Sequence, residues 1–151
     1  MKNQIELTTG KHWLCEKGML CSEFWIPEGR FMVDSRMILD HIESAVTVLS
    51  GNRLPFLNDM TSSEGILSFD ALKKWGQSEL LNEYRVAEAY IVKSLSDLIF
   101  IKQHIRLNDL KFPAMVFQSV ERAKEWLSQV KEDTTPSSFK NTKTQSKSER
   151  L

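Results

Sequence analysis

The chain has no apolar stretch long enough to cross a membrane and no apolar segment of the kind found in secretory signal peptides. A membrane helix needs about 20 consecutive, mostly apolar residues, whereas the amino-terminal sequence MKNQIELTTGKHWLC is largely polar. An excess of one charge is also absent, because 20 basic residues face 20 acidic ones. Polyanions attract proteins that cluster positive charge. These absences predict a cytoplasmic protein that spans no membrane and binds no nucleic acid.

Cysteine is scarce, and its spacing argues against two kinds of site. Cys15 and Cys21 form one isolated pair, which does not match the spacing of a zinc site. In a reducing compartment such a pair predicts two packed thiols rather than a disulfide. The pair flanks a hairpin turn predicted near Lys17 and Gly18. The length of that turn, which the sequence leaves open, decides whether the two cysteines face each other.

Signatures of catalysis and of cofactor binding are missing as well. The sequence contains no G-x-S-x-G, no G-x-x-x-x-G-K-[ST] and no G-x-G-x-x-G motif. His12, His41 and His104 lie far apart and lack metal-ligand spacing, which favours packed or solvated imidazoles. Asp40 and Glu43 lie on one face of a predicted helix, where acidic pairs usually form the solvated side. We therefore predict no enzyme, no cofactor and no metal.

What the chain does contain is enough apolar sequence for one domain. Hydrophobic residues make up 41% of its 151 residues, which is more than disordered chains carry. Residues 12–131 are predicted to form this domain, after a flexible amino terminus (1–11). Residues 132–151 hold only Phe139 and Leu151 as large apolar groups. They cannot offset the entropy lost on ordering, so a disordered tail is predicted.

Hydrophobic periodicity predicts alternating helices and strands after an amino-terminal hairpin. The hairpin covers residues 12–25, the helices about 34–51, 68–83, 96–108 and 119–131, and the strands about 54–59, 86–92 and 111–119. Single helices between consecutive strands require right-handed crossovers, which make those strands parallel. We predict an α/β fold with a mostly parallel sheet of four or five strands, the antiparallel hairpin and about four helices. The third helix is apolar nearly all round at its start, which predicts deep burial or pairing with another subunit.

Several of these segments together resemble the small bacterial STAS/SEC14-like (SpoIIAA-like) proteins. The resemblance covers residues 12–131 and rests on three marks. The first is the pattern S-G-x-x-x-P formed by Ser50, Gly51 and Pro55 between the first helix and the following strand. The second is the acid Asp59 at the end of that strand, and the third is the closing pattern F-x-S-x-x-x-A-x-x-W-L. The resemblance implies a compact sheet with helices on one side. It also implies a regulatory role: better-studied STAS relatives bind a kinase-like partner protein and release it when a serine at the start of the second helix is phosphorylated.

The serine that corresponds to this position is Ser68. The relatives carry the motif D-S-S/T-G there. In this chain Ile66 or Leu67 stands in place of the aspartate and Phe69 or Asp70 near the glycine, so the motif is absent. A hydroxyl before a helix also serves as an N-cap. The cap explains Ser68 without modification, and a phosphate there would meet the helix dipole favourably.

The candidate site is therefore the loop between the first predicted strand after the hairpin and the second helix. Ser68, Ser62, Ser63 and Asp59 are its candidate phosphoacceptors or partner contacts. The sequence favours a non-enzymatic regulatory or protein-interaction module, whose partner is another protein or a second copy of the chain. The alternative is a SEC14-like carrier of a small apolar ligand, with a pocket between the sheet and the third helix, Leu98 to Ile105.

Overall fold

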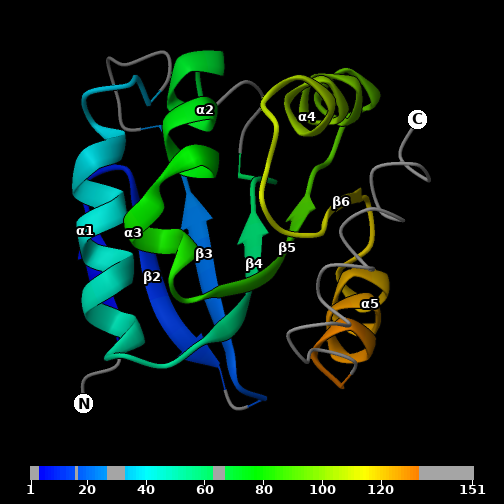
Figure 1. Cartoon of the computed structure of the whole chain (residues 1–151). Helices are drawn as coiled ribbons and strands as arrows, with labels where there is room; N and C mark the ends of the chain where they lie inside the picture. Colours follow the sequence, from blue (N-terminus) through cyan, green and yellow to red (C-terminus); the bar gives the residue numbers. More distant parts are fainter. Residues whose placement is uncertain (1–3, 16, 27–32, 63–66, 133–151) are drawn as a thin grey trace.

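The computed structural model describes residues 4–15, 17–26, 33–62 and 67–132 of the chain, with side chains up to residue 130. This part forms one sheet with helices packed against it (Figure 1). The strands are β1 (Gln4–Leu7), β2 (Gly10–Cys15), β3 (Met19–Phe24), β4 (Leu54–Asp59), β5 (Arg85–Ile91) and β6 (Ala114–Phe117). The helices are α1 (Ile38–Leu49), α2 (Phe69–Gln77), α3 (Glu79–Asn82), α4 (Leu95–Leu107) and α5 (Val120–Glu132). None of these helices is long and apolar enough to cross a membrane.

The strands follow one another across the sheet in chain order, from β1 to β6. The pairs β1–β2 and β2–β3 are antiparallel, and β3 to β6 are parallel. The predicted α/β class is confirmed, but the sheet has six strands rather than four or five, and five helices are described rather than about four. The additional strand β1 lies within residues 1–11, which were predicted to be flexible. The predicted tail lies outside the described residues from 133 onward.

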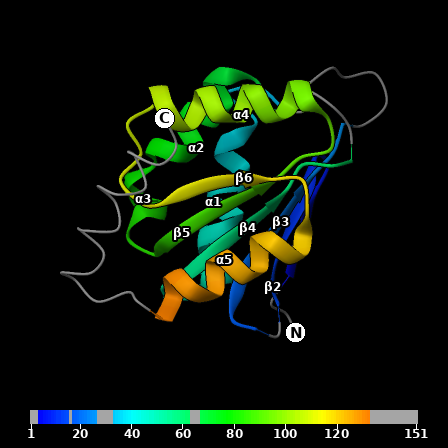
Figure 2. The ribbon, with the colours of Figure 1, turned by 90° about the vertical axis from the view of Figure 1, so that its right-hand side faces the viewer.

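Helices cover both faces of the sheet. Leu20 and Phe56 belong to the apolar core shared with α1, α2 and α4, whereas their neighbours Cys21 and Leu57 pack with α5. Neighbouring residues of a strand point to opposite faces. Helix α5 therefore lies on the face opposite the other helices (Figure 2). The one-sided arrangement implied by the family resemblance is thus not observed.

The hairpin places the two cysteines in neighbouring strands but not opposite each other. Cys15 pairs with Met19, and Cys21 pairs with Trp13. Both cysteines are free thiols, and Cys21 is buried. Burial, and next the neighbouring Cys15, raise the pKa of the Cys21 thiol to about 12. Because the thiolate is the reactive form, Cys21 is a packed, unreactive thiol.

The two ends of α1 differ in how they follow the sequence: Met37 is the N-cap residue and has no side-chain cap hydrogen bond, so a helix cap at Asp34 or Ser35, as the sequence predicts, is not observed. Asp34 Oδ1 accepts a hydrogen bond from the backbone N–H of Met37 (3.0 Å) in the turn that leads into the helix. At the other end Ser50 and Gly51 have φ angles of 49° and 83°. The chain thus leaves α1 through the left-handed conformation that a glycine after a helix predicts.

The second predicted helix, 68–83, is two helices in the structure. Helix α2 ends before Ser78, whose hydroxyl caps the short α3. Near the end of α2, a Cβ on Gly76 would lie 2.6 Å from Leu110 Cδ2 and 3.0 Å from His104 Cε1. The gain of about 1 kcal/mol that alanine usually brings to a helix is therefore offset by steric conflict. Glycine allows α2 to approach α4 and the loop that follows it.

Candidate functional site

The predicted partner loop begins at the carboxyl edge of the parallel strands. Asp59 Oδ1 accepts hydrogen bonds from the backbone N–H (2.9 Å) and the hydroxyl (2.7 Å) of Thr61. Ser62 is exposed, and its hydroxyl donates to Glu23 Oε2 at the end of β3 (3.3 Å). Ser63 lies outside the described residues. Asp59 and Ser62 therefore fix the start of this loop at the protein surface.

Ser68 is the N-cap of α2. Its Oγ accepts a hydrogen bond from the backbone N–H of Ala71 (3.0 Å), and its own N–H donates to the carbonyl of Val33 (3.0 Å). The residue is half-buried. The cap role is confirmed, and phosphorylation of Ser68 stays a prediction.

Substitutions of Ser68 should separate the two roles. Ser68→Ala should lower the free energy of unfolding by about 1 kcal/mol, because the N–H of Ala71 loses its acceptor. Ser68→Asp should leave stability unchanged, since the carboxylate accepts the same hydrogen bond at the positive end of the helix dipole. Urea unfolding followed by circular dichroism measures both. A Ser68→Ala variant as stable as the native chain would contradict the cap role.

An apolar surface adjoins the start of α2. On α4, Leu95 is 66% and Ile99 53% exposed. Phe69 of α2 contacts Phe100 of α4, the residue after Ile99, with 6.0 Å between ring centroids. We call Phe69, Leu95, Leu98, Ile99 and Phe100 the α4 surface. The deep burial of the third helix, one of the two outcomes predicted from the sequence, does not hold for its amino-terminal half.

Beneath α1, α2 and α4, a row of polar side chains crosses the centre of the sheet. The strand register places His12 opposite Ser22, Ser22 opposite Asn58, and Asn58 opposite Tyr90. All four are at most 1% exposed. Buried polar groups are tolerated when they are hydrogen-bonded. We call these residues, with the side chains bonded to them, the polar layer.

Glu88 of β5 is the acceptor at the centre of the polar layer. Its Oε2 accepts hydrogen bonds from Asn58 Nδ2 (2.7 Å) and Trp75 Nε1 (2.6 Å), and its Oε1 accepts from the hydroxyl of Tyr90 (2.5 Å). Arg85 Nη1 lies 3.2 Å from both carboxylate oxygens. The side chains of this ion pair are fully buried. Only donors surround the carboxyl group, which is the environment of an ionised carboxylate.

Arg85 uses its remaining donors on nearby protein groups. Nη2 donates to Asn82 Oδ1 (2.8 Å) and to the carbonyl of Trp75 (2.9 Å), and Nε donates to Asn82 Oδ1 (3.2 Å). The guanidinium carbon lies 5.2 Å from the ring centroid of Phe56 and 4.1 Å from that of Phe112. Hydrogen bonds and aromatic contacts thus compensate for the removal of this charge from water.

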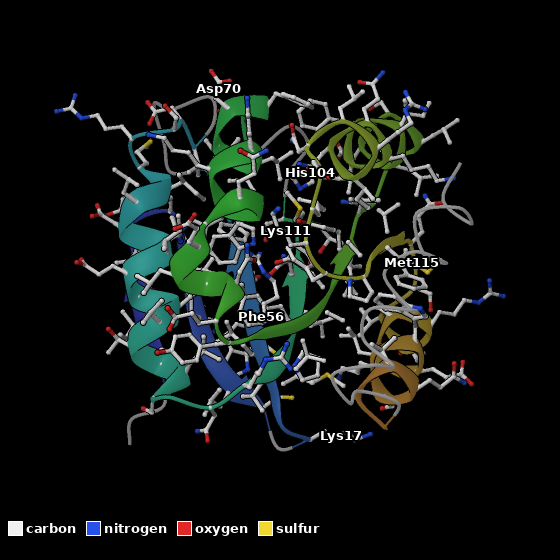
Figure 3. The ribbon with its side chains drawn as sticks, in the orientation of Figure 1. Lys17, Phe56, Asp70, His104, Lys111 and Met115 are labelled. Carbon is white, nitrogen blue, oxygen red and sulfur yellow. The ribbon has the colours of Figure 1, made fainter. Side chains whose placement is uncertain are left out.

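His104 belongs to α4 and extends the polar layer to that helix. It lies on the side of α4 that faces α2 (Figure 3). Its Nδ1 is 2.7 Å from Asn108 Nδ2, and its Nε2 is 3.0 Å from the hydroxyl of Tyr90. An amide nitrogen only donates, so Nδ1 accepts and Nε2 carries the proton. Burial, and next the positive Arg85, lower the pKa of His104 to about 3. The imidazole is therefore neutral at pH 7.

A second hydrogen-bonded chain connects the polar layer to α1. His41 Nε2 lies 2.7 Å from Thr9 Oγ1, and His41 Nδ1 lies 2.8 Å from His12 Nε2. His12 Nδ1 in turn lies 2.7 Å from Ser22 Oγ. Burial, and next His41, lower the pKa of His12 to about 3. Burial lowers the pKa of His41 to about 4 against the opposing effect of Asp40.

The polar layer cannot act on an external substrate. The hydroxyl of Ser22 is followed by the imidazoles of His12 and His41, an order that resembles a nucleophile and its general base. All three are at most 1% exposed, so no substrate reaches the hydroxyl. Among the residues that the structure describes, no group of three or more His, Cys, Asp or Glu could hold a metal ion. The polar layer therefore aligns helices on the sheet.

The ion pair of Arg85 and Glu88 was not predicted from the sequence. The signal was present, because the strand RVAEAYI carries a glutamate at its centre and an arginine three residues earlier. Every residue of this strand is buried. A charged residue in such a strand indicates a buried partner. No family model, no curated protein and no solved structure matches this chain.

Proposed function

We propose that the chain is a non-enzymatic regulatory module that docks a partner protein through the α4 surface and the adjoining start of α2. The observation that carries this proposal is the exposure of Leu95 and Ile99, 66% and 53%, beside the half-buried rings of Phe69 and Phe100. Exposed apolar side chains gathered in one place are typical of protein-binding surfaces. Their burial against a partner supplies the binding free energy.

The polar layer supports this role because it holds both docking helices to one strand. Trp75 of α2 donates to Glu88, and His104 of α4 is joined to Tyr90 two residues further along β5. Both contacts are fully buried. A surface with fixed geometry loses less conformational entropy on binding. The module therefore presents a pre-organised surface to its partner.

The start of α2 gives the proposed surface a means of regulation. Ser68 precedes Phe69, one of the docking residues. A phosphate on Ser68 would add about −1.5 to −2 charges next to an apolar contact, which disfavours a partner that buries Phe69. The resemblance to STAS proteins points to the same kind of switch, although the D-S-S/T-G motif is absent.

The alternative of an apolar-ligand carrier has weaker support. Ile101, Ile105 and Phe112 lie in the core cluster beneath α4 and are at most 3% exposed. These packed side chains occupy the place where the sequence predicts the ligand pocket. The packing beneath α4 therefore favours a partner protein over an apolar ligand.

Charge on the α4 surface tests the docking proposal. The variant Leu95→Glu/Ile99→Glu should lose a partner that the native chain captures from cells of its source. Leu39→Glu, which alters another exposed leucine (50% exposed) on α1, should retain that partner. Sedimentation velocity of the purified proteins shows whether the partner is a second copy. Thermal melts check that all variants fold. Identical captured proteins and identical sedimentation for the native chain and the double variant would refute the proposal.

A further inference from the structure

The exposed face of α4 changes from apolar to basic along the helix. Leu95, Ile99, Lys102 and Arg106 follow the spacing i, i+4, i+7 and i+11, which places them on one face. Leu95 and Ile99 are 66% and 53% exposed, and both basic side chains are exposed as well. Helix α4 lies along the upper edge of the molecule in Figure 2. The apolar half of this face belongs to the α4 surface, and the basic half continues it.

The basic half of α4 is not neutralised within the protein. The helix contains one acidic residue, Asp97, which is half-buried in the first turn and so lies at the apolar end. Neither Lys102 nor Arg106 forms an ion pair within 4.0 Å in the part of the chain that the structure describes. A partner that covers the α4 surface therefore meets two positive charges beside the apolar contact.

From this arrangement we infer that the α4 surface binds an acidic amphipathic segment of another protein, an inference that rests on the docking function proposed above. The apolar side chains of the segment pack on Leu95 and Ile99, and its carboxylates face Lys102 and Arg106. At a rise of about 1.5 Å per residue, these two residues lie about 4.5 and 10.5 Å beyond Ile99 along the helix. Carboxylates one and two turns after an apolar anchor of a helical segment match these distances.

A second copy of the chain fits this surface less well. In a twofold interface the same patch serves both copies. Lys102 and Arg106 of each copy would then face either the apolar half or the basic half of the other α4. Both arrangements remove positive charges from water without supplying a carboxylate, which is unfavourable.

An anionic membrane surface also attracts apolar and basic groups, but the charge on α4 is too small for this role. Sequences that bind anionic lipids usually cluster about four to eight basic residues, whereas the exposed stripe of α4 carries two. The whole chain has no excess of positive charge either. Two charges beside an apolar contact can instead select among protein partners by their charge.

Two synthetic peptides of about 18 residues test the inference. Both form the same amphipathic helix with leucine on one face, and they carry either glutamate or lysine at the polar positions. The glutamate peptide should bind the native chain with a dissociation constant below about 1 mM and at least about tenfold more tightly than the lysine peptide. Amide NMR titrations measure both affinities and should show the largest shifts on α4. Raising the salt concentration from about 0.05 M to about 0.5 M should weaken the binding of the glutamate peptide.

Charge reversal on α4 should reverse the preference between the peptides. Lys102→Glu/Arg106→Glu should weaken binding of the glutamate peptide at least about tenfold and strengthen binding of the lysine peptide. Because negative charge near the end of a helix is unfavourable, Lys102→Gln/Arg106→Gln serves as a milder variant. It should abolish the preference without reversing it.

Lys17→Glu/Arg122→Glu is the matched control. It makes the same change in net charge at exposed residues of the β2–β3 turn and of α5, and Lys17 lies at the opposite end of the molecule from α4 (Figure 3). This control should keep the preference for the glutamate peptide. Thermal melts check that every variant folds.

The inference is overturned if the glutamate peptide does not bind, or if the preference survives both α4 double variants. Binding to vesicles of phosphatidylserine and phosphatidylcholine, without binding of the glutamate peptide, would overturn it in favour of a membrane. Self-association that Leu95→Glu/Ile99→Glu abolishes would overturn it in favour of a second copy. A native partner that is lost by Leu95→Glu/Ile99→Glu but retained by Lys102→Glu/Arg106→Glu would overturn this inference alone and leave the docking function in place.

Discussion

Replacement of Glu88 by alanine is expected to lower the free energy of unfolding by about 3–5 kcal/mol, the range seen when one partner of a buried ion pair is removed. The carboxylate is fully buried, and Arg85, which remains, is fully buried too. Asn58, Trp75 and Tyr90 would lose an acceptor at the same time. Against a typical total stability of about 5–15 kcal/mol, this variant should be only marginally folded.

Two further variants identify the cause of this loss. Glu88→Gln keeps the volume and one acceptor oxygen but leaves Arg85 uncompensated, so it should still be strongly destabilised. The double variant Arg85→Met/Glu88→Leu removes both charges and should recover part of the stability, because apolar replacements of whole buried pairs are often tolerated. A double-mutant cycle then gives the coupling between the two residues.

Urea unfolding followed by tryptophan fluorescence and circular dichroism measures these changes. Glu83→Ala is the matched control, because Glu83 is exposed and forms no ion pair within 4.0 Å among the described residues. It should change stability by less than about 0.5 kcal/mol. If Glu88→Ala proved as mild as this control, the buried pair would not contribute as its geometry indicates.

The parts of the fold that the sequence reveals are those whose signals are local. Helix α1 has apolar residues at helical spacing, and Ile38, Ala45 and Leu49 of that pattern are buried. Ser68 precedes the first turn of α2 and caps it. Such features depend on residues three or four positions apart, so they can be read from the sequence alone. Strand β1 and helix α3, each of four residues, are too short to produce a periodic signal.

The polar layer could not be predicted, because its contacts are not local. His12 and His41 are 29 residues apart, and Asn58 and Glu88 are 30 residues apart. These side chains meet because of the order and the register of the strands in the sheet. The packed state of the imidazoles was among the sequence expectations, but their hydrogen bonds to each other were not.

Acidification should produce a comparable loss of stability. In the folded chain, burial lowers the pKa of His12 and His104 to about 3 and that of His41 to about 4. In the unfolded chain all three return to about 6.5, so the unfolded chain takes up more protons. The stabilisation is complete above pH 6.5 and is lost as pH falls toward the folded values. Each histidine should remove about 1.4 kcal/mol per pH unit within this window.

All three histidines together should therefore remove about 4 kcal/mol per pH unit, which places the onset of acid unfolding near about pH 5. Carboxylates titrate mainly below this range. Urea unfolding at a series of pH values measures the slope. His104→Gln retains a donor and an acceptor but does not titrate, so the slope should fall by roughly one third. A stability that stays constant between pH 7 and pH 5 would contradict the prediction.

The geometry of the histidine pair limits its protonation independently of the pKa values. One proton lies between His41 Nδ1 and His12 Nε2, which are 2.8 Å apart. If His41 donates, His12 directs its other N–H to Ser22; if His12 donates, His41 directs its other N–H to Thr9. One added proton can be accommodated, but two would set an N–H against an N–H. The folded pair therefore takes up at most one proton, whereas the unfolded chain takes up two. Because burial also lowers both pKa values, imidazole ¹⁵N NMR should show both rings neutral in the folded protein at about pH 5.5. Titration of both rings near the ordinary pKa of 6.5 would refute this arrangement.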